Sequence, residues 1–265
     1  MFLNFFAFIF GAVVGSFLNV CIFRLPAKIS IIKPLSQCPH CHHPIRFYDN
    51  IPLISYIVLK GKCRDCGGTI SWRYPLVELL TAVLSLFLFI KIVNIAPLVP
   101  IPIGLVLNFL IYFIFVSVLI IIAFIDLDHQ IIPDVLTLPG IPIFFLLAVF
   151  VVKDVPWLDA LIGLLVGGGV LFGIAFVYEL ITKREGMGGG DIKLLAMIGG
   201  FLGWKSLIFI LLFSSFSGAI IGIAVMIIKK QDMKYAVPFG PFLSAAAVAY
   251  LFWGDAFMRI LLLGY

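Results

Sequence analysis

Long apolar stretches separated by short polar segments make up most of this chain. Eight stretches predict membrane-crossing helices, at residues 2–23, 76–96, 103–125, 135–152, 157–181, 192–203, 205–228 and 239–264. A crossing helix needs roughly 20 apolar residues. The stretch at 192–203 is short for a full crossing, so a tilted or partial helix would fit it. The proline cluster APLVPIP at 96–102 separates the second stretch from the third.

The composition agrees with this pattern and defines the fold class. Hydrophobic residues make up 63% of the chain and charged residues 12%, whereas soluble domains have about 25% charged residues. A closed β-barrel needs short alternating segments, which this sequence lacks. The first apolar stretch has no positive segment before it, so we expect a retained helix rather than a cleaved signal peptide. We therefore predict an all-α polytopic membrane protein with about eight transmembrane helices.

The distribution of positive charge predicts the orientation of the helices. Eight of the 18 lysines and arginines fall in one polar segment, residues 24–75, which we call the tetracysteine loop. Because lysine and arginine concentrate in cytoplasmic loops, this loop is expected inside. Alternation then places loops 126–134, 182–191 and 229–238 inside as well, together with fourteen of the 18 basic residues. The net charge of +5 is therefore explained by topology, and we expect no nucleic-acid partner.

Four of the five cysteines form two pairs within the tetracysteine loop. They are CPHC and CRDC, with 21 residues between the pairs, and the cysteines are Cys38, Cys41, Cys63 and Cys66. Four thiolates at this spacing suit a structural zinc ion or, less often, an iron–sulfur cluster. Disulfides are the competing interpretation, although a reducing cytoplasm disfavours them. A site of four thiolates is closed, so the metal would fold the loop and perform no chemistry.

Other residues near the cysteines have simpler interpretations. His40, His42 and His43 could compete as metal ligands, but with four cysteines present we expect solvated loop residues. Cys21 lies in the first apolar stretch and is expected to be a small buried hydrophobic residue.

Two aspartates stand at one predicted membrane face. Asp126 follows directly on the uncharged third stretch, and Asp191 follows the sequence GMGGG at the start of the sixth. Ionisable residues at such positions are costly and tend to be functional. Two carboxylates in a poorly solvated site share a proton, which is the arrangement used by aspartic proteases.

The glycines before Asp191 have two interpretations. Without Cβ atoms, Gly188, Gly189 and Gly190 would let a peptide backbone approach the carboxylate. Alternatively, the glycines only break a helix and Asp191 caps the next one. Glu78 and Glu179 lie about a turn inside predicted helices, where snorkelling or pairing with an arginine would account for them.

Several motifs in order along the chain resemble the type IV prepilin peptidases, a family of GxGD-type intramembrane aspartic proteases. GSFLNVCIFRLP at 15–26 resembles the opening signature of the family, and CPHC, NIPLISY and LKGKCRDCGGTISWRYPLVE resemble its cytoplasmic domain. IDLDHQIIPDVLTLPG at 125–140 and GMGGGDIKLLAMIGG at 186–200 are similar to its two catalytic segments. PFGPFL at 238–243 matches a C-terminal element.

The resemblance implies a function and a site. It makes Asp126 and Asp191 the catalytic pair, in preference to the rivals Asp128 and Asp134, and makes the four paired cysteines the metal ligands. Implied substrates are prepilins and pseudopilins, whose short basic leader is cleaved after a glycine at the cytoplasmic face of the bacterial inner membrane. Family members with the tetracysteine domain typically also methylate the new N-terminal residue with S-adenosylmethionine, so both activities are expected. We find no glycine-rich nucleotide loop that would hold this cofactor.

The expected organisation is an N-terminal domain at 1–100, linked to methyl transfer, and a transmembrane peptidase core at 101–265. Two other classes of function compete with a membrane peptidase. One is a transporter whose inward carboxylates bind a cation or proton, and the other is a non-catalytic assembly factor that docks partners through its zinc loop.

Overall fold

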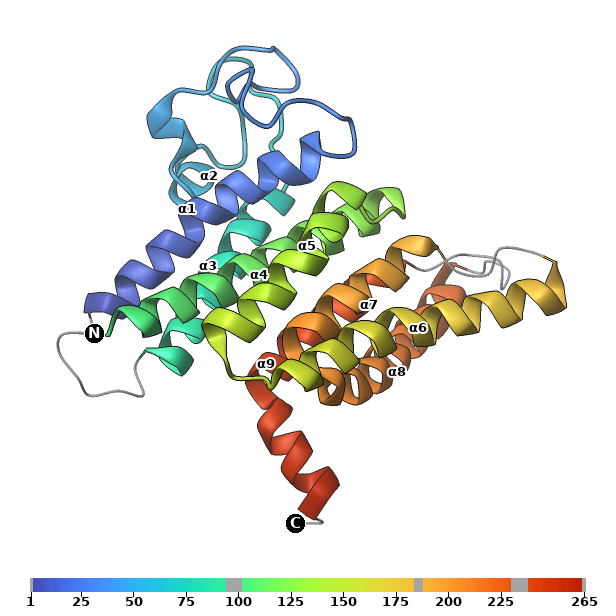
Figure 1. The fold of residues 1–265 in the computed structure, drawn as a ribbon. Helices are drawn as coiled ribbons and strands as arrows, with labels where there is room; N and C mark the ends of the chain where they lie inside the picture. Colours follow the sequence, from blue (N-terminus) through green and yellow to red (C-terminus); the bar gives the residue numbers. More distant parts are fainter. Residues whose placement is uncertain (1, 94–101, 184–187, 230–237, 264–265) are drawn as a thin grey trace. The chain divides into compact units, whose positions relative to one another are not determined.

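The computed structural model describes residues 2–93, 102–183, 188–229 and 238–263, and within these ranges the chain is almost entirely helical (Figure 1). The elements are α1 (Phe2–Arg24), the 3-10 helix η1 (Phe47–Asn50), α2 (Ile54–Val58), α3 (Arg73–Ile92), α4 (Ile103–His129), α5 (Asp134–Leu147), the π-helix η2 (Ala148–Val152), α6 (Trp157–Thr182), α7 (Gly189–Leu202), α8 (Trp204–Lys229) and α9 (Gly240–Leu263). Most of the proline cluster at 96–102 and the basic residues Arg184, Lys230 and Lys234 lie outside the described residues.

The long helices match the predicted apolar stretches, but the count of eight crossings is not confirmed. Six helical segments of the described chain are long and apolar enough to cross a membrane: α1, α3, α4, α5 with η2, α6 and α8. In α9 the apolar helix is shorter, at Gly240–Gly254, and α7 has only 14 residues. The fold is therefore the predicted all-α membrane class, with six candidate spans.

Helix α7 is short because protein surrounds it. Every residue from Leu194 to Leu202 is buried, and α5, α6, α8 and α9 all contact this helix. A helix enclosed by other helices does not have to match the roughly 30 Å thickness of the hydrocarbon layer. The dozen apolar residues that look too few for a crossing are enough for this central position.

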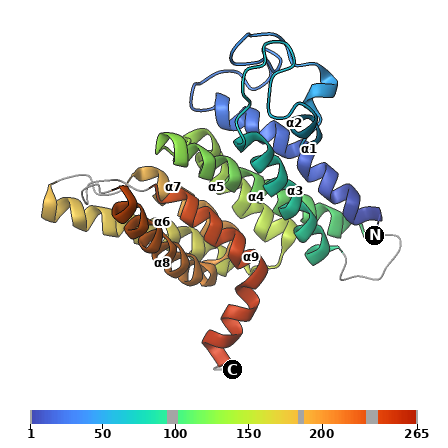
Figure 2. The same cartoon turned by 180° about the vertical axis from the view of Figure 1, so that it is seen from behind.

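The chain divides into two compact units, Met1–Ile121 and Ile122–Tyr265. In the first unit, α1 and α3 lie side by side (Figures 1 and 2). A Cβ atom on Gly11 would lie 2.5 Å from Cβ of Ser85, and the hydroxyl of Ser85 donates a 2.7 Å hydrogen bond to the carbonyl oxygen of Ala7. Small residues and such hydrogen bonds are typical of helices that pack closely within membranes.

The second unit is built around α7. Gly163 of α6 and Gly199 of α7 touch backbone to backbone. On the side facing α5, the rings of Phe144 and Phe201 pack edge to face with centroids 5.4 Å apart. The predicted organisation into a domain at 1–100 linked to methyl transfer and a peptidase core at 101–265 stays a prediction.

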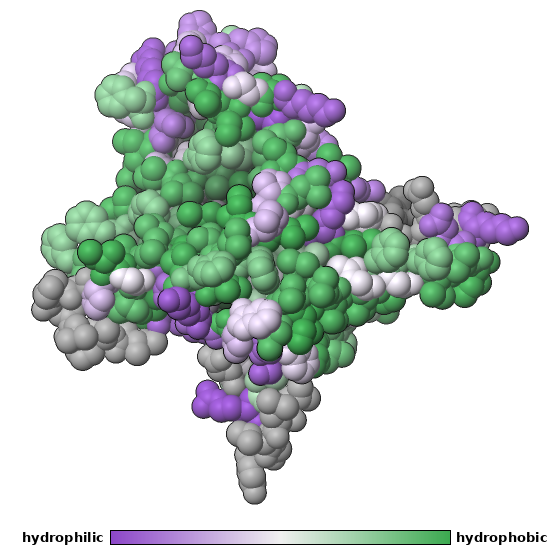
Figure 3. Space-filling model, viewed as in Figure 1, coloured by the Kyte–Doolittle hydropathy of each residue, from purple (hydrophilic) through white to green (hydrophobic). Residues whose placement is uncertain are grey.

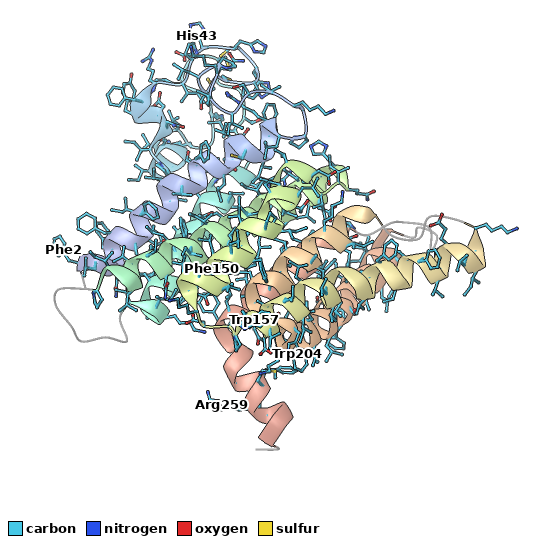
Figure 4. The ribbon with its side chains drawn as sticks, viewed as in Figure 1. Phe2, His43, Phe150, Trp157, Trp204 and Arg259 are labelled. Carbon is cyan, nitrogen blue, oxygen red and sulfur yellow. The ribbon has the colours of Figure 1, made fainter. Side chains whose placement is uncertain are left out.

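One end of the second unit carries a tryptophan pair. Trp157 opens α6 and Trp204 opens α8, and the two lie at the same end of these helices (Figure 4). The indole N–H of Trp204 donates to Asp159 at 3.1 Å, and Lys205 pairs with the same carboxylate at 3.3 Å. Tryptophan and charged partners at helix ends are typical of a membrane–water interface.

Polar and apolar residues occupy different parts of the visible surface. In Figure 3, hydrophobic residues cover the long helices and hydrophilic residues gather over the tetracysteine loop. This distribution agrees with a loop in water and helices in lipid.

Candidate active site and metal centre

Asp126 is a buried carboxylate near the end of α4. Only 5% of its surface is exposed, and Ile122 and Ile125 beside it are fully buried. The helix continues past Asp126 to His129, so the aspartate lies inside the last turn rather than after the helix. An ionisable group buried at such a position requires a specific partner.

The partner of Asp126 is the first residue of α9. The backbone N–H of Gly240 donates a 2.9 Å hydrogen bond to Oδ2 of Asp126. A Cβ atom at position 240 would lie 2.7 Å from the same oxygen and 3.1 Å from Cδ1 of Ile132. Only glycine allows α9 to begin this close to the carboxylate, and the N-terminus of a helix favours a negative charge.

Asp191 lies in the first turn of α7. Its Oδ1 atom is buried and has no hydrogen-bond partner among the residues that the structure describes. Gly188 occupies the N-cap position, and Gly189 and Gly190 already belong to the helix. The alternative in which the glycines break a helix and Asp191 is the cap is therefore wrong. A buried oxygen without a partner marks a place where a ligand or water belongs.

The second unit brings these two aspartates together from 65 residues apart in the sequence. The negative charge of Asp126 acts on the carboxyl group of Asp191. Ile132, in the turn after α4, contacts both Gly190 and Gly240 and so connects the starts of α7 and α9. The inner part of the site therefore comes from α4, the turn after it, α7 and α9.

The glycines predicted to give access differ from one another. Gly188 and Gly189 are exposed, and no atom of the described residues lies within 4 Å of a Cβ built on either. The space beside Gly190 is filled by Ile132, because a Cβ added to Gly190 would lie 2.7 Å from the Cβ of Ile132. Substrate access at this segment stays a prediction, and the open space is confined to Gly188 and Gly189.

The two rival aspartates of the first segment are exposed. Asp128 lies on the outside of the last turn of α4, and Asp134 forms a 2.6 Å ion pair with Lys193. This ion pair joins the first turns of α5 and α7 at the surface, where such pairs contribute little to stability.

The two glutamates within helices differ in their burial. Glu179 is exposed on α6. Glu78 is buried in α3, and its Oε2 accepts a 2.8 Å hydrogen bond from the backbone N–H of Leu53.

The four cysteines of the tetracysteine loop form one cluster. The sulfur atoms of Cys38, Cys41, Cys63 and Cys66 all lie within 4.8 Å of one another. The Sγ atoms of Cys38 and Cys66 are 3.8 Å apart, which is about the edge of a tetrahedron around zinc with bonds of about 2.3 Å. A disulfide would need about 2.05 Å. The donor set therefore fits a closed four-thiolate metal site.

Each cysteine pair sits in the same kind of turn. An isolated β-bridge closes the first turn between Gln37 and Pro44, and a second bridge closes the other between Lys62 and Thr69. In each turn the N–H of the first cysteine donates to the carbonyl five residues on, at 3.0 Å for Cys38 and 2.8 Å for Cys63. The spacing C-x-x-C thus folds into two equivalent knuckles.

The thiols themselves favour a bound cation. The backbone N–H of Cys41 lowers the pKa of Cys38 to about 6. The backbone N–H of His43 lowers the pKa of Cys41, but burial and the neighbouring cysteines outweigh it and raise this pKa to about 12. One thiolate therefore makes the next harder to form, because negative charges at this distance repel. A divalent metal removes that repulsion and can hold all four thiolates.

Surrounding residues hold the knuckles in place. The guanidinium group of Arg64 donates to both carboxylate oxygens of Asp49 in η1, at 2.7 and 2.8 Å, and lowers the pKa of Asp49. His43 lies at the outer tip of the loop (Figure 4), and His42 is likewise exposed. The ring of His40 lies against Gly68, and His40 is not part of the group of four sulfur donors. The histidines thus match their predicted place outside the donor set.

Sequence reasoning missed Gly240. PFGPFL was noted only as a matching motif, because nothing in the local sequence indicates that its glycine contacts a carboxylate 114 residues earlier. A glycine at the start of an apolar helix permits a close approach of another group, but it does not identify the carboxylate that approaches.

Comparison with known proteins assigns the family. A model of the bacterial peptidase A24 N-terminal domain matches residues 9–92, and a model of the type IV leader peptidase family matches residues 113–223. No solved structure matches the chain.

Curated relatives cover most of the chain. The prepilin leader peptidase/N-methyltransferase of Aeromonas hydrophila is 40% identical over 95% of this chain and 91% of its own length. The protein of that name from Pseudomonas aeruginosa is 36% identical over 94% of this chain and 90% of its own length. That from Myxococcus xanthus is 43% identical over 84% of this chain and 63% of its own length. On these matches, the chain belongs to the type IV leader peptidase family.

Proposed function

We propose that this chain cleaves the short basic leader of type IV prepilins or pseudopilins and methylates the new N-terminal residue. Cleavage falls after a glycine at the cytoplasmic face of a bacterial inner membrane. The names of the relatives support this substrate class. The observation that carries the peptidase is the meeting of Asp126, Asp191 and the N-terminus of α9 in one buried place.

The two aspartates have different surroundings, which supports a different role for each. Asp126 receives an N–H donor at the start of a helix, and such a donor favours a charged carboxylate. Asp191 is half-buried, its Oδ1 atom is buried without a partner among the described residues, and the charge of Asp126 acts on it. Two neighbouring carboxylates do not both ionise readily, so Asp126 is the ionised base and Asp191 holds the proton.

The reaction then follows from these protonation states. Asp126 removes a proton from a water molecule while the oxygen of that water attacks the carbonyl carbon of the scissile glycine. Asp191 gives its proton to the carbonyl oxygen, so that a neutral tetrahedral diol forms. The carbon–nitrogen bond breaks as the leaving amine takes the proton from Asp126, and a hydroxyl proton of the diol returns to Asp191. Such general acid–base steps contribute roughly 100- to 10,000-fold each.

The methyl-transfer activity is supported by the N-methyltransferase names and by the match to the N-terminal family domain. S-adenosylmethionine would supply the methyl group, and zinc held by the four cysteines would keep the tetracysteine loop folded. The described residues contain no β-strand and therefore no Rossmann-type nucleotide site, and we assign no residue to the methyl donor.

Purified protein in detergent, mixed with a prepilin, tests both activities. Mass spectrometry would show loss of the leader and addition of one methyl group. Asp126→Asn and Asp191→Asn should each reduce cleavage roughly 100-fold or more, because charge and proton are lost while side-chain volume hardly changes. Asp128→Asn, at an exposed position of the same helix end, is the matched control and should cleave normally.

The variants also separate the competing classes of function. Full cleavage by either the Asp126 or the Asp191 variant would refute the pair. Absence of cleavage by folded wild-type protein would instead favour a transporter or an assembly factor.

A further inference from the structure

The segment between the two knuckles exposes more apolar surface than a loop in water should. Helix α2 presents Ile54, Ile57 and Val58 at 59%, 74% and 66% exposure, and Phe47 just before it is 87% exposed. Trp72, at the start of α3, is 66% exposed. Large apolar side chains gathered in one short segment indicate an interaction site.

A buried hydrogen bond fixes the depth of this segment. The N–H of Leu53, directly before α2, donates to Glu78 of α3 at 2.8 Å, so the start of α2 lies beside the second turn of α3. Glu78 lies five residues into a candidate membrane span that begins at Arg73, which is about 7 Å along the helix axis. The interfacial layer on each side of a bilayer is about 5–7 Å thick. With α3 spanning the bilayer from Arg73, the start of α2 would be level with the boundary between headgroups and acyl chains.

The backbone before α2 is bent to reach this position. Leu53 has a φ of 63°, a backbone conformation that is uncommon for a residue with a Cβ. The carboxylate of Glu78 accepts the N–H that this bend presents. The bend and the buried acceptor together hold α2 against the membrane-entry turns of α3.

The charges beside the apolar residues complete the pattern. Lys60 and Lys62 follow α2 and are both exposed. A short helix with apolar side chains and adjacent lysines is typical of segments that lie in the interface of a membrane containing anionic lipids. Trp72 at the entry of α3 is typical of the same layer.

We propose that α2 is an interfacial helix, with Ile54, Ile57 and Val58 inserted at the acyl boundary of an anionic bilayer and the two lysines against its headgroups. The tetracysteine loop is then a membrane-surface domain, held flat on the lipid by α2, rather than a free cytoplasmic domain. This inference rests on the membrane span of α3 and is independent of the proposed catalytic pair.

Photocross-linking in nanodiscs tests the proposal. The photoreactive residue p-benzoylphenylalanine is placed at position 57 of the full chain, with position 43, at the outer tip of the loop, as the matched control. Position 57 should give a lipid adduct by mass spectrometry and position 43 should give none. The yield at position 57 should fall several-fold when phosphatidylglycerol is replaced by phosphatidylcholine.

Each other outcome would overturn the inference. A cross-linked dimer would assign the patch to a second copy of the chain, and a cross-link to added prepilin would assign it to the substrate. An equal lipid yield at positions 43 and 57 would remove the depth assignment, and an equal yield in both lipids would remove the role of the lysines. Position 54 provides a second site, and retained metal content shows that each variant is folded.

Discussion

At the scale of single residues, Gly240 decides how the charge of Asp126 is held. Gly240→Ala places a Cβ against the carboxylate oxygen that the backbone N–H now contacts. Because a carboxylate that loses a donor is protonated more easily, cleavage should fail at a higher pH on the acid side than in the wild type. A pH–rate profile of kcat/KM measures this shift.

Gly169→Ala is the matched control for this change. Gly169 lies in α6, and no atom lies within 4 Å of a Cβ built there, so its profile should equal that of the wild type. An unshifted acid limb in the Gly240 variant, while the Asp126 and Asp191 variants remain inactive, would contradict the role of Gly240 and leave the catalytic pair intact.

Equivalent positions in the two knuckles show what the turn demands of a residue. His42 has a φ of 57° and Gly67 a φ of 70°, yet only glycine adopts this region without strain. Gly67→Ala meets no neighbouring atom, so the strain alone should destabilise the metal-bound loop by roughly 1 kcal/mol. Chelator titration of bound zinc measures the loss, and unchanged retention would show that this turn tolerates a side chain.

At the scale of elements, the contact between α6 and α7 is the tightest of the second unit. Gly163→Ala would drive a Cβ into the backbone of Gly199, and overpacking of this kind costs roughly 1–3 kcal/mol. Thermal unfolding in detergent should therefore occur at lower temperature. The Gly169→Ala variant of the same helix should not show this loss, and equal unfolding temperatures would contradict the close packing.

The positions of the helices could be predicted from the sequence, but which helices are surrounded by others could not. Apolar length was enough to locate the predicted helices of the described chain within a few residues, including the short α7, because each forms its own backbone hydrogen bonds. It did not show that α7 is surrounded by four helices, since burial on every side and exposure to lipid select the same apolar residues. Helix α2 was not predicted either, because its five residues are too few to stand out from the polar loop around them.

At the scale of the whole molecule, the proposed metal site and the proposed catalytic pair lie in different units. The cysteine cluster lies within Met1–Ile121, and both aspartates lie within Ile122–Tyr265. Cys63→Ser should release the metal and unfold the tetracysteine loop, so methylation should fall while part of the cleavage survives. Metal analysis and mass spectrometry of the product report the two effects.

Chelation of wild-type protein gives the complementary test. Because the metal is expected to be structural and enclosed by four thiolates, the chelator should inhibit slowly and incompletely. Rapid, complete loss of cleavage would instead indicate a metalloprotease.

Site residues that form a local sequence pattern were predictable, and contacts between elements distant in the sequence were not. Asp126 and Asp191 stood out because each interrupts an apolar run, and the cysteines because their spacing is local. The backbone donor of Gly240 and the acceptor role of Glu78 were not predictable, since both are contacts between elements and neither leaves a local pattern. Family resemblance indicated PFGPFL without giving it a purpose.

The unpartnered oxygen of Asp191 has a use in inhibitor design. A buried acceptor left unsatisfied costs about 1–3 kcal/mol, and Oδ1 of Asp191 is such an atom. A small molecule that places a single hydroxyl group there, on an apolar stem that replaces the pilin helix, would recover this energy on binding. Potency should then depend more on that one hydroxyl than on the length of the stem.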